Sequence, residues 1–96
     1  MRGLMISLVL LAASVANAAP TSPSPIEFVK ALAEFTGKPV AIGDIRRISC
    51  RGIEQEPTEA ECTWQQKSGK KWMRFSAYIA VDGDGWHLID DPRLIH

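Results

Sequence analysis

Beyond Gly43, apolar and polar residues alternate with a period of two, and this alternation constrains the fold more than any other feature. It predicts four strands, over residues 45–51, 60–66, 71–81 and 86–90. Successive side chains of a strand point to opposite faces, so each turn must keep the apolar residues on one side of the sheet. The first turn does so when Cys50 lies opposite Cys62.

The two later turns agree with the first. A tight turn at residues 68–69 places Trp64 opposite Met73, and the next turn is centred on residues 83–84. A slip of one residue at any turn would move a whole strand's apolar side chains to the other face. The predicted apolar face consists of Ile48, Cys50, Cys62, Trp64, Met73, Phe75, Ala77, Ile79, Val81, Trp86 and Leu88.

A helix with clear signals at both ends precedes the strands. Ser24 is a favourable N-cap, Pro25 suits the first helical position, and Glu27 completes a capping box. Gly37 ends the helix, so its predicted bounds are Pro25 and Thr36. Its apolar stripe can cover the apolar sheet face; the stripe consists of Phe28, Val29, Leu32 and Phe35.

These elements predict an α+β fold with one N-terminal helix packed on a four-stranded antiparallel β-meander. Residues 25–91 are expected to form one small domain, between a flexible Pro/Ser-rich N-terminus at 19–24 and a C-terminal tail at 92–96. The layout is reminiscent of cystatin-like folds, an analogy of architecture that implies no function.

The first 18 residues have the composition of a cleaved signal peptide. Arg2 provides a positive start, residues 3–15 are uncharged, and residues 16–18 form the small-x-small pattern of a cleavage site. We expect cleavage after Ala18 and export to the periplasm or the extracellular space. An uncleaved membrane anchor is the alternative, although the uncharged run is at the short end of what spans a bilayer.

Export determines the expected redox state of the two cysteines. In an oxidising compartment, the isolated pair of Cys50 and Cys62 predicts one disulfide. Closing a loop of about a dozen residues should add roughly 3 kcal/mol to the free energy of unfolding. A redox or metal role is the alternative, but the Cys-x-x-Cys spacing typical of such sites is missing.

Composition and motifs argue against several function classes. Without its first 18 residues the chain keeps ten of its eleven Lys and Arg and all eleven Asp and Glu, a balance that does not favour nucleic-acid binding. The two histidines, His87 and His96, form no zinc motif. Ser76 and His87 can approach each other across the third and fourth predicted strands, but nothing in the sequence marks them as a nucleophile and its base. We therefore expect neither a cofactor nor an enzymatic activity.

The polar face of the sheet is the first candidate site. It is predicted to set Arg47, Gln65 and Trp72 in one row, with Thr63 beside Arg74. Trp, Tyr and Arg dominate binding hot spots, so this face can engage a partner protein or an anionic ligand; a solvated surface is the alternative. The candidate binding residues are Arg47, Trp72, Arg74 and Tyr78.

Charge is expected to separate toward the two ends of the strands. One end carries Glu54, Glu56, Glu59, Asp82 and Asp84, and the other carries Arg46, Arg47, Lys67, Lys70 and Lys71. Asp82 and Asp84 are also weak candidates for a cation site, although a tight hairpin turn explains the segment better because Trp86 replaces a calcium ligand.

The sequence thus predicts a small exported, non-enzymatic binding module that contacts a partner protein in an accessory or inhibitor-like role. The alternative is a small-ligand or weak cation-binding protein of the cell envelope. Neither the partner nor the oligomeric state follows from the residues.

Overall fold

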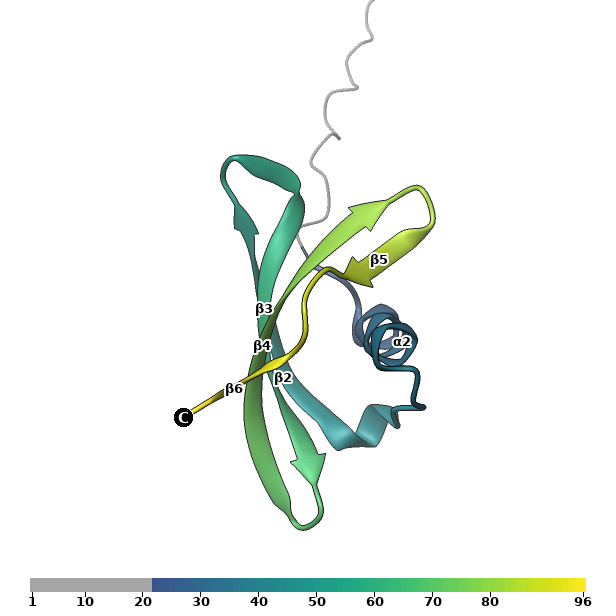
Figure 1. Cartoon of the computed structure of the whole chain (residues 1–96), viewed down its shortest axis with the longest axis vertical. Coiled ribbons are helices and arrows are strands. Elements are labelled where there is room, and N and C mark those ends of the chain that lie inside the picture. Colours follow the sequence, from purple (N-terminus) through teal and green to yellow (C-terminus); the bar gives the residue numbers. More distant parts are fainter. Residues whose placement is uncertain (1–21) are drawn as a thin grey trace, which may run out of the picture.

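The computed structural model describes residues 22–96, and the predicted signal peptide at residues 1–18 lies outside them. Helix α2 (Pro25–Thr36) and the short 3-10 helix η2 (Ile42–Asp44) precede one antiparallel sheet (Figure 1). Its strands are β2 (Ile45–Ile53), β3 (Glu56–Ser68), β4 (Lys71–Asp82), β5 (Gly85–Leu88) and β6 (Arg93–Ile95). The predicted α+β fold is therefore confirmed, with one strand more than expected.

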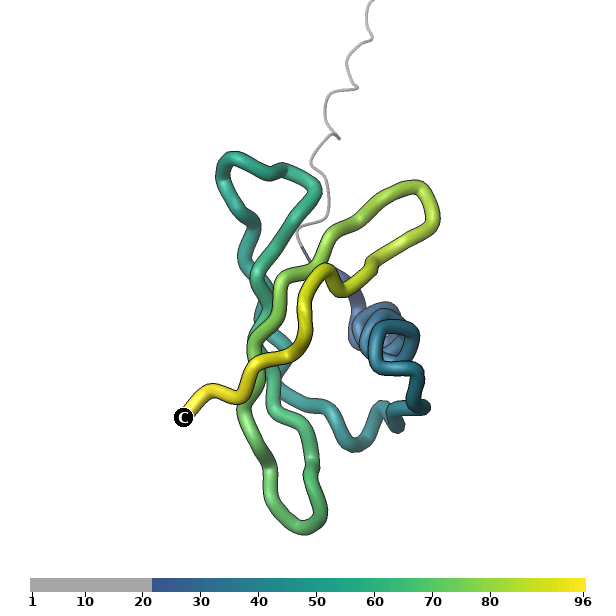
Figure 2. Tube along the Cα trace, viewed as in Figure 1, coloured from purple at the N-terminus to yellow at the C-terminus, as the bar shows by residue number. Residues whose placement is uncertain are grey.

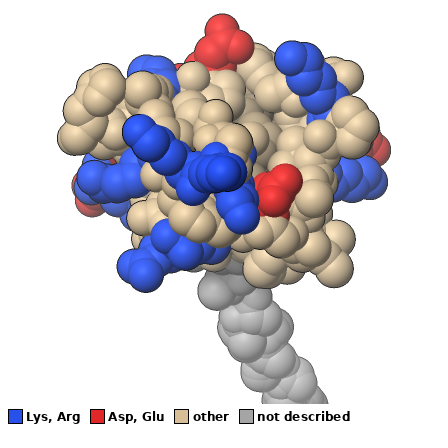
Figure 3. Space-filling model, turned by 90° about the horizontal axis from the view of Figure 1, so that it is seen from below, with Lys and Arg blue, Asp and Glu red and all other residues tan. Residues whose placement is uncertain are grey.

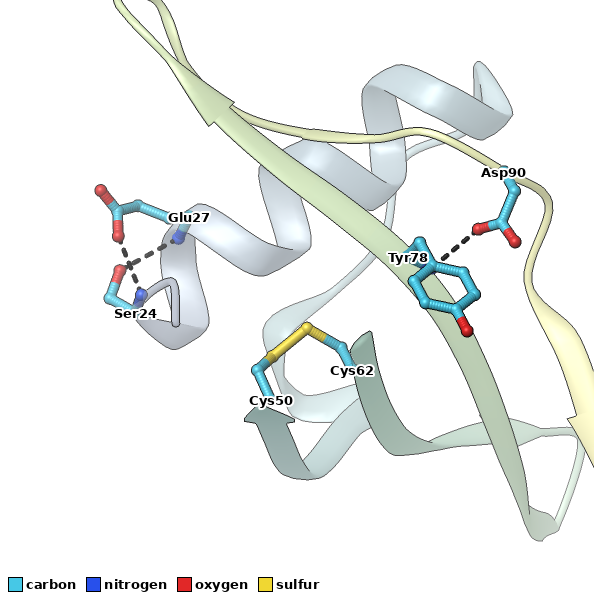
Figure 4. Close-up of a disulfide and its surroundings, with 6 residues drawn as sticks. All are labelled: Ser24, Glu27, Cys50, Cys62, Tyr78 and Asp90. Carbon is cyan, nitrogen blue, oxygen red and sulfur yellow. Dashed lines mark hydrogen bonds between the residues drawn. A yellow bond between two sulfur atoms is a disulfide. The ribbon is translucent and has the colours of Figure 1, made fainter. Parts of the chain in front are cut away.

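Helix α2 has the predicted bounds and caps. The Ser24 hydroxyl accepts the Glu27 amide N–H at 3.2 Å, and the Glu27 carboxylate accepts the Ser24 N–H at 2.8 Å (Figure 4). At the other end Gly37 adopts a φ of 73°, a left-handed conformation that glycine tolerates best. The predicted flexible segment at 19–24 is described only from residue 22 onward, and there Pro23 is buried.

Five strands share the sheet in the order β2-β3-β4-β5, with β6 also paired to β4. Because β3 occupies one edge of β4, β5 and β6 share the other edge at different ends (Figure 2). The residues expected to form a C-terminal tail therefore belong partly to the sheet: Arg93 lies opposite Ser76, and Ile95 lies opposite Arg74.

The strand register agrees with the prediction at two hairpins and differs at the third. Cys50 lies opposite Cys62 and Val81 lies opposite Trp86, as predicted. Trp64, however, lies opposite Phe75 and not Met73, so β3 and β4 are shifted by two residues. Gly69, with a φ of 65°, takes the first position of the two-residue loop, where hairpin turns need a positive φ.

A β-bulge in β2 changes which side chains face the core. Arg46 lies opposite Gln65, but Ser49 lies opposite Thr63, so β2 holds an extra residue between them. Arg47 occupies this bulge with a φ of 57°. The bulge turns Ile45 toward the core, where it is 7% exposed, and leaves Arg46 on the outer face of the sheet.

The core lies between α2 and the predicted apolar face. Trp64 is at its centre, with its ring centroid 4.8 Å from that of Phe28 and 6.0 Å from that of Phe75. Phe35 was expected to be buried with the apolar stripe of the helix, but it is 40% exposed. Ala31, which was not part of the predicted stripe, is buried instead. The buried apolar residues are Phe28, Ala31, Leu32, Ile45, Ala60, Cys62, Trp64, Ala77, Ile79, Trp86 and Leu88.

Candidate functional site

Basic side chains gather around the end of the molecule that carries the β3–β4 turn. Figure 3 shows the molecule from this end, where several Lys and Arg side chains are grouped on the surface and few Asp or Glu side chains are visible. They come from three neighbouring strands and the turn that joins two of them. We call this group the basic end; it consists of Arg46, Arg47, Lys67, Lys70, Lys71 and Arg74.

Arg46 and Trp72 form the centre of the basic end. The guanidinium carbon of Arg46 lies 3.9 Å from the ring centroid of Trp72, within the range of a cation–π interaction. Nε of Arg46 also donates to Oε1 of Gln65 at 2.6 Å, which fixes the orientation of the guanidinium. Lys67, opposite Trp72 in the register, holds its ammonium nitrogen 5.8 Å from the same ring centroid.

The charges of the basic end are not compensated locally. Within residues 22–96, ion pairs join Arg51 to Glu61 and Arg93 to Asp90, and the contact between His87 and Asp82 is an ion pair only when His87 is protonated. None of them includes a residue of the basic end. Six cationic side chains therefore lie close together without a carboxylate partner in the described chain, which produces a local positive field.

The four predicted binding residues do not form one cluster. Trp72 and Arg74 share the outer face at the basic end, whereas Arg47 lies on the bulge. Tyr78 is six residues beyond Trp72 along β4, about 20 Å away at strand rise. There its ring centroid lies 5.4 Å from the guanidinium carbon of Arg93.

Two features displace the predicted neighbours at this end of the face: the two-residue shift between β3 and β4, and the bulge in β2. The row that contains Gln65 joins it to Arg46 and Arg74, not to Arg47 and Trp72. Thr63 lies opposite Ser76 and not beside Arg74. Sequence reasoning therefore missed Arg46 as the partner of Trp72, and no sequence signal marked the bulge that places it there.

Arg51 and Glu61 lie opposite each other and form an ion pair across β2 and β3. Nη2 of Arg51 donates to Oε1 of Glu61 at 2.7 Å. This hydrogen bond, together with the carboxylate charge, raises the pKa of the Arg51 guanidinium. The charge of Arg51 is thus balanced by the carboxylate of Glu61. The cations of the basic end have no such partner among the described residues.

Acidic residues lie at the opposite end, at the tips of the β2–β3 and β4–β5 hairpins (Figure 1). Oδ1 of Asp82 accepts the backbone N–H of Asp84 at 2.7 Å and lies 3.1 Å from Nε2 of His87. The backbone hydrogen bond is the main cause of a lowered Asp82 pKa. Residues 22–96 contain no group of three or more His, Cys, Asp or Glu side chains arranged to hold a metal ion.

Ser76 and His87, considered above as a nucleophile and base, have separate partners. The Ser76 hydroxyl accepts from Nη2 of Arg93 at 3.4 Å, whereas His87 pairs with Asp82. In the register Ser76 lies opposite Thr63 and Arg93, and His87 lies opposite Ala80. In the described part of the chain, Ser76 therefore pairs with Arg93 and not with the candidate base His87.

The disulfide holds β2 and β3 together beside the bulge. Cys50 and Cys62 are joined as predicted, with a Cα–Cα distance of 4.0 Å and a sequence separation of 12 (Figure 4). Cys62 is fully buried in the core. The crosslink therefore anchors the strand that carries Arg46 to the most buried part of the sheet.

No family model matches the sequence, and no curated protein or solved structure shows significant similarity to it. Over residues 22–96, no helix has the length and apolar character needed to cross a membrane.

Proposed function

We propose that this chain is a small exported, non-enzymatic binding module that contacts an acidic surface of a partner protein through its basic end. The contact between Arg46 and Trp72 carries the proposal. Trp and Arg are the side chains most enriched at binding hot spots. The pair is already in place without a partner, because Arg46 on β2 contacts both Trp72 on β4 and Gln65 on β3. Ordering it on binding therefore costs little conformational entropy.

The charge distribution supports an acidic partner. The basic end has no local carboxylate partners among the described residues, and the acidic hairpin tips lie at the other end. Because the chain is nearly neutral overall, long-range attraction is weak, and the separated charges mainly orient an approaching partner. An acidic protein surface that meets the basic end gains charge-assisted hydrogen bonds, and these have directional specificity.

The disulfide and the composition of the N-terminal sequence support the exported location in this proposal. A crosslink between Cys50 and Cys62 is compatible with an oxidising, exported environment. A small helix-on-sheet domain suits an accessory or inhibitor-like role. We include in this proposal the likeness of its architecture to cystatin-like folds. The cation-binding alternative is weaker, because Oδ1 of Asp82 already accepts the Asp84 N–H.

The test is affinity capture from an envelope extract, with wild type compared with an Arg46→Ala, Trp72→Ala variant. We expect a protein that wild type retains, that elutes as salt rises, and that the variant fails to retain. Soluble poly-glutamate should compete for the site, and poly-lysine should not. Elution by salt follows because exposed charge interactions are screened within about 10 Å at 0.1 M salt.

A matched control is Lys30→Ala combined with Ile26→Ala, which removes one cation and one exposed apolar side chain from α2. This variant should capture the same protein as wild type. Capture that survives loss of Arg46 and Trp72 would place the contact elsewhere on the molecule. No capture by any folded variant would refute a stable protein partner.

A further inference from the structure

A cavity of about 540 Å³ lies between the end of α2, the loop that follows it, and the inner face of β3 and β4. Asp91 and Pro92, in the segment between β5 and β6, line another side of it. Its volume is in the range of small-molecule binding sites. None of the residues of the basic end lines it, so it is a separate feature of the molecule.

Most of the cavity wall is apolar. Phe35 and Phe75 contribute aromatic rings, and Leu32 and Val40 contribute aliphatic groups. The wall also explains why Phe35 is 40% exposed although it belongs to the helix stripe: it faces an open cavity instead of a packed core. An apolar ligand group placed there would remove this exposed surface from water, which favours binding.

Two opposite charges stand at this apolar cavity. Lys38 lies in the loop after α2, and Asp91 lies in the segment between β5 and β6. Neither side chain takes part in an ion pair within residues 22–96, with the other or with a third residue. The cavity thus has one uncompensated cation and one uncompensated anion, which come from two different segments.

Gln66 adds a polar group to the same lining. Its Oε1 accepts the indole N–H of Trp64 at 3.1 Å, so the side-chain amide of Gln66 is held in place. Trp64 also stacks on Phe75, with ring centroids 6.0 Å apart. Because Gln66 and Phe75 line the cavity and contact Trp64, a molecule bound there should change the NMR signal of the Trp64 indole.

We propose that this cavity binds a small zwitterion with an apolar side chain, the chemistry of a free aromatic or branched-chain amino acid. Lys38 meets the ligand carboxylate, Asp91 meets its ammonium group, and the apolar wall around Phe35 and Phe75 takes the side chain. A ligand with only one charge would leave the other cavity charge unpaired and would be repelled by the charge of its own sign. The proposal is independent of the partner-binding role of the basic end.

The experiment is a titration of the purified protein with L-phenylalanine, followed through the indole N–H resonance of Trp64 and by calorimetry. Three further probes each remove one part of the chemistry. 3-Phenylpropionate lacks the ammonium group, phenethylamine lacks the carboxylate, and glycine lacks the apolar side chain. We expect saturable binding of L-phenylalanine below about 10 mM, and binding of each other probe that is weaker by about tenfold or more.

The variants Lys38→Gln and Asp91→Asn should each weaken L-phenylalanine binding by about tenfold, because each removes one charge-assisted contact. Lys30→Gln and Glu54→Gln, which make the same chemical changes outside the cavity, should leave the affinity unchanged. Equal binding of 3-phenylpropionate and L-phenylalanine would overturn the zwitterion assignment. An unchanged Trp64 resonance at about 10 mM L-phenylalanine would overturn the site itself.

Discussion

The carboxylate of Asp90 accepts the backbone N–H of Tyr78 at 2.7 Å (Figure 4). This contact lies where β5 has ended and β6 has not yet begun, so a side chain replaces the missing strand partner of β4. The Ile89 N–H donates to the Tyr78 carbonyl at 3.0 Å, and the second oxygen of Asp90 pairs with Arg93. Asp90 therefore keeps β4 hydrogen-bonded and attaches β6 to the sheet.

Replacing Asp90 should consequently destabilise the domain more than its partly exposed position suggests. Asp90→Ala leaves the part-buried Tyr78 N–H without an acceptor and Arg93 without its ion pair, at a cost of about 1–3 kcal/mol in the free energy of unfolding. Asp90→Asn keeps an acceptor and should cost less. Urea denaturation provides the measurement.

The neighbouring Asp91 is the matched control for this effect. It makes no ion pair in the described chain, so Asp91→Ala should change the free energy of unfolding by less than about 0.5 kcal/mol. Equal losses in Asp90→Ala and Asp91→Ala would show that the contact with Tyr78 contributes nothing.

The sequence could predict which face of the sheet each side chain occupies, because this depends only on whether a residue is at an odd or an even position along its strand. The register between β3 and β4 was wrong by two residues, yet a shift of two returns every side chain to the same face. Trp64, Ile79 and Leu88 are therefore buried as expected. The pairing of Cys50 with Cys62 was also predictable, because a disulfide across a hairpin fixes the register directly.

The cross-strand neighbours at the basic end could not be predicted, since they depend on the absolute register between β3 and β4 and on the bulge in β2. Two residues decide this outcome. Gly69 moves the turn by one position, and Arg47 adds a residue to β2. The three-residue strand β6 depends on the side chain of Asp90 and carries no periodic pattern of its own. The centre of the basic end therefore became visible only in the structure.

The strained bulge residue leads to a second prediction. Arg47 has a φ of 57°, a conformation that costs a non-glycine residue about 1–2 kcal/mol. Arg47→Gly should raise the free energy of unfolding by about 0.5–1 kcal/mol, since the relief of strain exceeds the entropy cost of glycine. Arg47→Val should lower it, because a β-branched side chain tolerates positive φ poorly.

Urea denaturation of these variants beside Arg46→Gly separates bulge strain from side-chain contacts. Arg46 lies outside the bulge and contacts Trp72, so its replacement by glycine should be destabilising. A finding that Arg47→Gly is less stable than Arg47→Ala would contradict the assignment of strain to this position.

The disulfide leads to a third prediction. Replacing Cys50 and Cys62 together by Ala should lower the free energy of unfolding by about 3 kcal/mol, because the unfolded chain loses a crosslink over a sequence separation of 12. For a domain of this size that is a large part of the total stability. Thermal unfolding with and without a reducing agent gives the measurement. Reduction should destabilise wild type and leave the double variant unchanged, and equal sensitivity would exclude the crosslink as the cause.

The hydrogen bonds of Asp82 lead to a prediction about acid stability. The Asp84 N–H lowers the folded-state pKa of Asp82 below its unfolded value of about 3.9. Such a carboxylate stabilises the fold above its unfolded pKa, and this contribution is lost as the pH falls through the folded pKa. Asp82→Asn keeps an oxygen for the turn but cannot titrate. Its urea midpoint should therefore decline less than that of wild type below about pH 4, whereas Lys30→Gln, which removes no acidic group, should follow wild type. Parallel curves for wild type and Asp82→Asn would rule out Asp82 as a source of acid sensitivity.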